Sequence, residues 1–173
     1  GPFIGRESVA VSGARVASIV GASWLDVPAA AQVAGFALDP HWERRRLYFS
    51  VIGSVGGSDG IIYYTDLSGT PTAVSLVSAI TYSLVDPSGL AINFEKKKLY
   101  WVDHPNPTST TVTALYYSDL DGANSGKVSE YNTIDDNTLS GGIGGLSLNF
   151  ANDTAIFVDQ GATNSFYEVP VSG

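Results

Sequence analysis

The hydrophobic pattern of the chain repeats three times, as short apolar runs separated by polar turns. The clearest copy spans 89–122, where three runs rich in aromatic and β-branched residues each end at Gly, Asp or Asn. Runs of this length and composition predict consecutive antiparallel β-strands. The other copies begin at Gly35 and Gly145, which lie 54 residues before and 56 residues after Gly89. A period of about 50 residues with several strands per copy predicts the blades of a β-propeller.

We therefore expect an all-β fold with three propeller blades, each of four antiparallel strands, in a single domain over 1–173. The expected bounds are about 34–78 for the first blade, about 88–131 for the second and about 144–171 for the third. The third copy ends after its third strand, and residues 15–20 match the fourth strands of the other copies. Residues 15–20 are expected to complete the last blade, because such strand sharing pairs two edges that would otherwise stay open.

The pattern within each copy also predicts how the blades pack. The first strand is apolar on both faces at 36–38 and 90–92, which is typical of a strand between two neighbouring sheets. The tyrosine doublets at 63–64 and 116–117 lie in the third strands. We expect them to fill the gaps between blades, in preference to forming a ligand cage.

Composition narrows the class of protein further. The chain has 173 residues with 44% hydrophobic content, enough for one core. The net charge of −8 argues against a nucleic-acid partner, which would need a basic surface. No apolar run approaches the roughly 20 residues of a membrane helix, so membrane insertion is not expected. The chain has no cysteine, which excludes disulfides and thiolate chemistry.

Charge is expected to differ between the two faces of the blades. Six of the nine basic residues fall in the turns between first and second strands, at 44–46 and 96–98, where we interpret them as solubilising charges. The long loops leave the opposite face, and that face is expected to be acidic. It supplies the candidate ligand-binding residues: Asp59, Asp103, His104, Asp135, Asp136 and Asp159.

The motifs for catalysis and metal binding are weak. His41 lies in a hairpin turn, and His104 would need metal-binding partners from other blades. Residues 135–137 offer oxygen ligands for Ca²⁺ without the alternating spacing of a calcium loop. The sequence contains no catalytic triad order, HExxH motif or phosphate loop. We therefore expect no cofactor and no enzymatic activity, with Ca²⁺ as the one metal alternative.

One family is similar to this pattern. The runs Gly89–Asn93, Lys98–Asp103 and Tyr117–Asn124 resemble the YWTD repeat of the low-density-lipoprotein-receptor family. The resemblance covers roughly 34–173, and the motif position is held by 100–103, more loosely by 156–159, and poorly by 48–51, which lacks the Asp. It implies six-bladed propellers, an extracellular or secreted location, and a scaffold that binds proteins. It also implies that Asp103 is a structural residue that bonds between blades.

Three blades leave two apolar end faces uncovered, which a soluble monomer rarely tolerates. We expect a homodimer in which two copies form one six-bladed ring, residues 15–20 of each copy completing the last blade of the other. A protein or glycan ligand would bind the acidic loop face. The alternatives are half of a longer six-bladed chain, which a second third-strand candidate at 7–13 favours, a Ca²⁺-dependent hydrolase of the lactonase type, and a structural or coat protein. Binding of Ca²⁺ at submillimolar concentration would favour the hydrolase.

Overall fold

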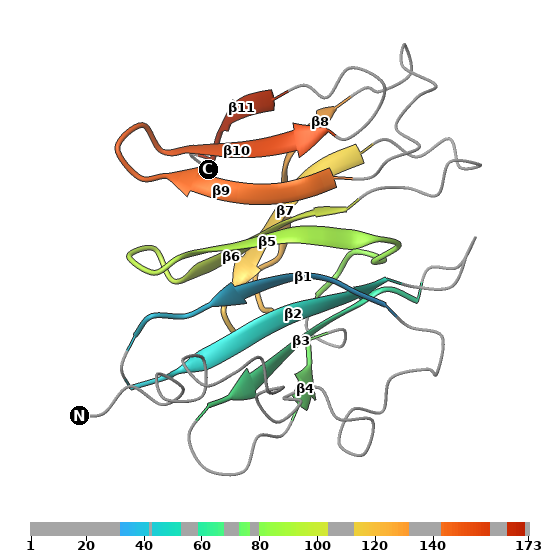
Figure 1. The fold of residues 1–173 in the computed structure, drawn as a ribbon, viewed down its shortest axis with the longest axis vertical. Coiled ribbons are helices and arrows are strands. Elements are labelled where there is room, and N and C mark those ends of the chain that lie inside the picture. Colours follow the sequence, from blue (N-terminus) through green and yellow to red (C-terminus); the bar gives the residue numbers. More distant parts are fainter. Residues whose placement is uncertain are drawn as a thin grey trace, which may run out of the picture.

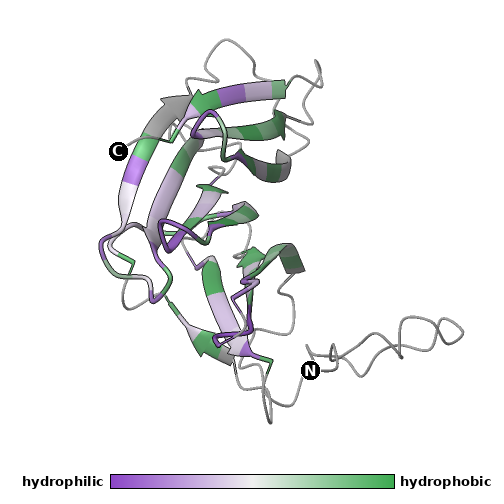
Figure 2. Cartoon of the chain, turned by 90° about the vertical axis from the view of Figure 1, so that its left-hand side faces the viewer, coloured by the Kyte–Doolittle hydropathy of each residue, from purple (hydrophilic) through white to green (hydrophobic). Residues whose placement is uncertain are grey.

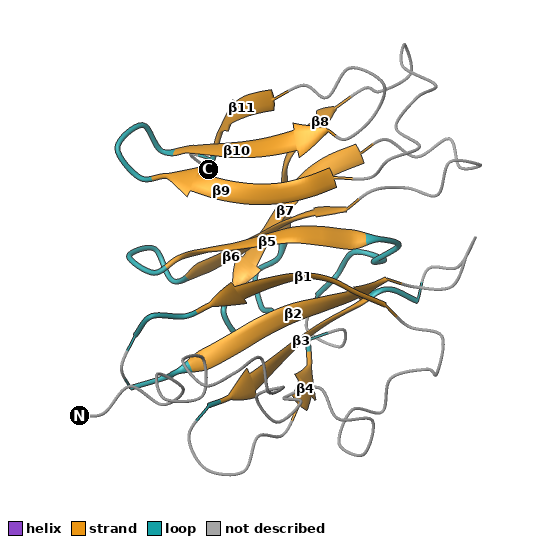
Figure 3. Cartoon of the chain, viewed as in Figure 1, coloured by secondary structure: helices purple, strands orange, loops and turns teal. Residues whose placement is uncertain are grey.

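The structure is a computed structural model that describes residues 32–41, 43–52, 59–67, 73–76, 80–103, 113–131, 143–159 and 166–171. Within these ranges every regular element is a β-strand (Figure 3). The described ranges contain no helix of the length and apolarity that crossing a membrane requires.

Three antiparallel sheets follow one another along the chain (Figure 1). Blade one consists of β1 (Gln32–Leu38), β2 (Arg46–Ile52), β3 (Ile61–Asp66) and β4 (Ala73–Ser75). Blade two consists of β5 (Pro87–Asn93), β6 (Lys98–Asp103), β7 (Thr113–Asp119) and β8 (Gly126–Tyr131). Blade three consists of β9 (Ile143–Asn149), β10 (Thr154–Asp159) and β11 (Phe166–Pro170). Each sheet pairs its strands in chain order, so the predicted all-β fold of propeller blades is confirmed. Residues 15–20, the expected fourth strand of blade three, lie outside the described residues.

The blades stack side by side as an open arc. Their first strands, β1, β5 and β9, are neighbours in space and carry most of the contacts between blades (Figure 1). Turned by 90°, the three sheets follow a curve that does not close on itself (Figure 2). The chain therefore has two ends of the arc, one at blade one and one at blade three.

Two hydrophobic clusters hold the arc together, one at each junction between blades. The junction of blades one and two buries Tyr48 and Ile62 from one side and Leu90, Leu99 and Trp101 from the other. A second set fills the junction of blades two and three: Tyr100, Val102, Leu115, Ala155, Phe157 and Val171. Alternate residues of β6 thus point to opposite neighbours, as the pleat of a strand between two sheets requires.

One aromatic pair recurs in every blade. Its two members face each other across the second and third strands as Phe49–Tyr63, Trp101–Tyr116 and Phe157–Tyr167, with ring centroids 5.3, 5.8 and 5.4 Å apart and nearly parallel planes. Offset stacking of this kind adds to the area that the rings bury. Tyr64 and Tyr116 pack against the cluster between blades one and two, and Tyr117 packs against the cluster between blades two and three, which confirms the predicted role for these three tyrosines.

Candidate functional site

The positively charged side chains at the basic turns form ion pairs with carboxylates on the same face. Arg44 pairs with the buried Asp39 at 2.5 Å, and Lys96 pairs with Asp153 in the neighbouring turn, also at 2.5 Å. Arg46 and Lys98, the first residues of β2 and β6, also form ion pairs, with Asp66 at 2.8 Å and with Asp119 at 2.6 Å. Each of these four cations therefore has its own carboxylate, and the contrast expected between a basic and an acidic face stays a prediction. The interpretation of the cations as structural charges fits them better than a binding patch.

Asp103, a candidate ligand-binding residue, is buried, and its carboxylate is hydrogen-bonded to backbone amides. Its carboxylate accepts hydrogen bonds from the amide of Asp86 at 2.7 Å and from the amide of Val85 at 3.1 and 3.2 Å. Both amides belong to the linker that enters β5 from blade one. Asp103 thus ties the end of β6 to the connection between blades, which agrees with the structural role that the resemblance implies.

Burial raises the pKa of Asp103 to about 6, even though the amides of Asp86 and Val85 act in the opposite direction. A raised pKa means that the folded chain holds the proton more tightly than the unfolded chain. Asp103 therefore makes its full contribution to the free energy of unfolding below about pH 4, and this contribution is lost as the pH rises through about 6. Because the pKa of Asp103 is raised by about two units, the free energy of unfolding should fall by up to about 3 kcal/mol across this pH range.

We expect Asp103→Asn to remove this component of the pH dependence, because an amide does not titrate. The free energy of unfolding in urea, measured between pH 4.5 and 7 at one protein concentration, should fall less steeply in the variant than in the parent chain. Glu95→Gln, at an exposed turn position, is the matched control and should leave the slope unchanged. An equal slope in the parent chain and Asp103→Asn would contradict the assignment.

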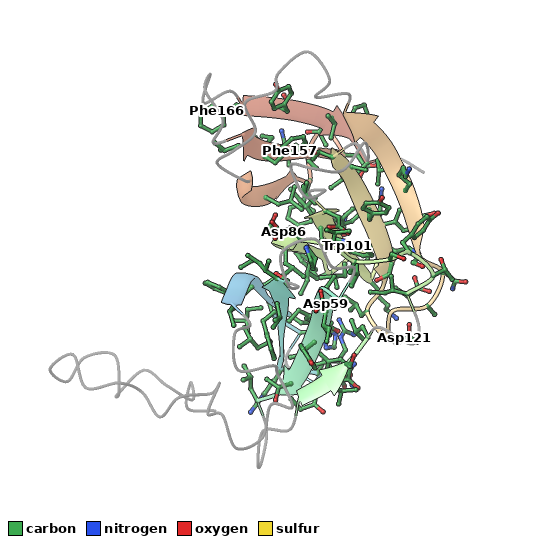
Figure 4. The ribbon with its side chains drawn as sticks, turned by 90° about the vertical axis from the view of Figure 1, so that its right-hand side faces the viewer. Asp59, Asp86, Trp101, Asp121, Phe157 and Phe166 are labelled. Atoms are coloured by element: carbon green, nitrogen blue, oxygen red, sulfur yellow. The ribbon has the colours of Figure 1, made fainter. Side chains whose placement is uncertain are left out.

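Of the remaining candidate residues, Asp59 and Asp159 belong to the described part of the chain. Asp59 is exposed and precedes Gly60, whose amide donates to the carbonyl of Leu84 at 3.0 Å. Figure 4 shows Asp59 from the loop side. The backbone of Asp159 ends β10, whereas His104, Asp135 and Asp136 lie outside the described residues. Ligand binding by the acidic loop face stays a prediction.

The first strands of neighbouring blades approach each other closely at a glycine, Gly35 against Gly89 and Gly89 against Gly145. A Cβ added at Gly35 would lie 3.0 Å from the amide nitrogen of Gly89, and one added at Gly89 would lie 3.1 Å from Cβ of Leu146 and 3.2 Å from the carbonyl carbon of Gly145. A Cβ added at Gly145 would meet no atom of the described residues within 4 Å. A side chain at either junction would therefore require the neighbouring backbone to shift by a few tenths of an ångström, whereas the same position on blade three meets no described atom.

The end face of blade one exposes the apolar side chains that the other blades bury. Phe36 is 73% exposed, whereas Leu90, at the same place in blade two, is 5% exposed. Leu38 and Val33 on β1 are also exposed, at 56% and 48%. On the same face, Phe49 of β2 is buried, so the exposed part of this blade-one end face lies along the innermost strand.

The blade-three end face is also partly apolar. Phe166 is 76% exposed, although Ile62 and Leu115, its counterparts in blades one and two, are fully buried between blades. Figure 4 shows Phe166 at the tip of the arc and Trp101 inside it. This face also carries a polar side chain, since Glu168 stands where blades one and two have Tyr64 and Tyr117. Glu168 accepts a hydrogen bond from the hydroxyl of Thr154 at 2.6 Å.

One exposed aromatic pair was missed by the sequence analysis. Phe94 and Phe150, in the first turns of blades two and three, lie with ring centroids 5.4 Å apart and are 44% and 47% exposed. The signal in the sequence was the shared Asn-Phe at the end of the first strand, in Asn93-Phe94 and Asn149-Phe150. In both turns the asparagine side chain accepts a backbone hydrogen bond, from Lys96 and from Ala151.

Comparison with known proteins gives similarities at the level of fold. No family model matches the chain, and no curated protein matches it. One similar solved structure is a chain from the crystal structure of a nidogen/laminin complex, with a TM-score of 0.45 and 18% identity, covering 84% of this chain and 63% of that one. Another is the β-propeller domain of the Trilobed protease from Pyrococcus furiosus, described as having an open velcro topology, with a TM-score of 0.46 and 11% identity, covering 82% of this chain and 43% of that one. This chain thus spans less than two thirds of the length of either.

Proposed function

We propose that this chain is a non-enzymatic β-propeller scaffold that binds another macromolecule, and that two copies join end to end as one six-bladed ring. The observation that carries the proposal is the glycine contact that runs from Gly35 to Gly89 to Gly145 and is open at Gly145. The blade-one end face of a second copy offers the same backbone, Gly35 followed by Phe36, that Gly89 and Leu90 offer inside the chain.

Burial of the two end faces supplies the driving force for this pairing. Complete burial of a side chain as large as Phe36 or Phe166 stabilises an assembly by about 1.5–3 kcal/mol. A two-fold axis makes each contact occur twice, since blade three of each copy meets blade one of the other. The ring then has no uncovered blade face, which is the condition that closed propellers satisfy.

The binding role belongs to the loops that join second to third strands and one blade to the next. The second and third strands pair antiparallel in each blade, so the strand ends that these loops join lie at one edge of the sheets, on strands with buried cores. Variable loops on a rigid scaffold are a common arrangement for recognition. We propose a protein or glycan ligand there, with Asp59 as a described surface residue, and an extracellular location.

Electron microscopy of negatively stained particles tests the proposed ring. Class averages should show closed discs with six blades and a central channel. Open arcs of three blades, at protein concentrations above the micromolar range, would overturn the proposal.

A further inference from the structure

The outer edge of β11 differs from the corresponding edges in blades one and two. There the third strands pair with a fourth strand, as β3 with β4 and β7 with β8. The described residues place no fourth strand beside β11. Four of the five residues of β11 are exposed, whereas neither β3 nor β7 has an exposed residue. An edge strand of this kind is a template for another strand.

The lengths of the linkers between blades indicate which segment belongs there. Residues 76–86 join β4 to β5, and residues 132–142 join β8 to β9, so each linker has eleven residues. With Arg15 aligned to Lys127, Ile19 takes the place of Tyr131, and residues 20–31 precede β1 at Gln32, a linker of twelve residues. The spacing is close to that of a fourth strand in the blade that precedes blade one.

We propose that residues 15–20 of a second copy of this chain pair with β11 as the fourth strand of blade three. This inference rests on the proposed ring, in which the blade that precedes blade one of either copy is blade three of the other. A linker of similar length then spans the same kind of junction that residues 76–86 and 132–142 span within the chain. Each copy gives one strand and receives one, so the exchange is symmetric.

One side chain of the segment, Arg15, has a counterpart in the fourth strand of blade two. Arg15 matches Lys127 of β8 in the sequence pattern, and the ammonium of Lys127 lies 5.8 Å from the ring centroid of Tyr116. Tyr167 is the counterpart of Tyr116 in blade three, since each stacks on the aromatic residue of the neighbouring strand. In the register of blade two, Arg15 of the second copy would therefore lie over Tyr167, in the cation–π contact that Lys127 makes with Tyr116.

A rival arrangement pairs 15–20 with 7–13 of the same chain, as the last two strands of a blade that lies upstream. It leaves β11 without a strand from this chain, and it predicts no proximity between residue 16 and residue 168. The two arrangements therefore differ in a distance that cross-linking measures.

Disulfide cross-linking tests the exchange cleanly, because the chain has no cysteine of its own. Two single variants, Val16→Cys and Glu168→Cys, are unfolded and refolded together and then oxidised. In the register of blade one, where Tyr64 pairs with Val74, these two positions are partners. Ala14→Cys replaces Val16→Cys for the register of blade two, where Tyr117 pairs with Gly126.

We expect up to about half of the protein to appear as a cross-linked pair of the two variants in one of these registers, because random pairing makes about half of the dimers mixed. The double variant Tyr64→Cys/Val74→Cys is the positive control, because its bridge forms within one chain, and Ser23→Cys with Glu168→Cys is the negative control. Cross-linking no stronger than that of Ser23→Cys in both registers would overturn the exchange. A bridge within single chains of Val16→Cys/Glu168→Cys would also overturn it. If the mass in solution is still that of two chains, the ring stands without the exchange; if the mass is that of one chain, both proposals fail.

Discussion

If the chain forms the proposed ring, Gly145→Val is expected to convert it into single chains of 18.2 kDa while the three blades stay folded. In the isolated chain the added Cβ meets no atom within 4 Å, and Gly145 is not among the glycines with positive φ, so valine is compatible with the strand. In the ring the same side chain would meet the partner's Gly35 backbone, at the separation of about 3 Å seen between Gly35 and Gly89. Sedimentation equilibrium gives the mass, and far-ultraviolet circular dichroism gives the strand content.

Gly89→Val is the matched control for this experiment. Gly89 has φ of 55°, and its Cβ would lie 3.1–3.2 Å from Gly145 and Leu146. Valine there is strained in the chain itself, so this variant should lose stability as well as assembly. A Gly145→Val protein that remains a dimer, or one that unfolds as Gly89→Val does, would contradict the interpretation of the open glycine position.

Trp101→Ala is expected to lower the free energy of unfolding by about 3–5 kcal/mol, the usual cost of truncating a buried tryptophan. Trp101 is fully buried between blades one and two, and it stacks on Tyr116 at 5.8 Å. A domain of this size has a total stability of about 5–15 kcal/mol, so the variant should be marginally folded. Unfolding in urea followed by circular dichroism measures the loss.

Trp101→Phe separates the packing of the ring from its polar group. The indole nitrogen Nε1 is buried and has no hydrogen-bond partner among the described residues, and Phe49 and Phe157 hold the same position in the other blades. Phenylalanine removes a buried donor that costs free energy, so this variant should keep most of the stability that Trp101→Ala loses. Equal losses in the two variants would contradict the role assigned to the stacked pair.

The blades could be predicted from the sequence because the repeat is marked at several points. The glycines at 35, 89 and 145 set the phase, and the aromatic residues at 49, 101 and 157 mark the second strand of each blade. These marks reflect physical needs, since close backbone approach requires glycine and each junction needs a large flat side chain. The strands therefore fall where the pattern places them.

The distribution of charge could not be predicted, because it depends on which strand ends lie side by side. Arg46 and Asp66 are 20 residues apart in the sequence and become partners only through the register of β2 and β3. The contact of Lys96 with Asp153 further requires two adjacent blades. Counting basic residues in the turns thus overstated the charge of that face.

The exposed ends of the arc were predicted in general, but the residues that form them were not. The sequence at Phe36 and Phe166 resembles the sequence at their buried counterparts, Leu90 and Leu115. Their different exposure follows only from the position of the blade in the arc. The same holds for β11, whose sequence is that of a third strand although the described residues place no fourth strand at its edge.

The mass of the unmodified chain in solution tests the central claim most directly. Sedimentation equilibrium at micromolar concentration should give twice 18.2 kDa, because two arcs are needed to cover both end faces. A stable, soluble species of 18.2 kDa under the same conditions would contradict the ring.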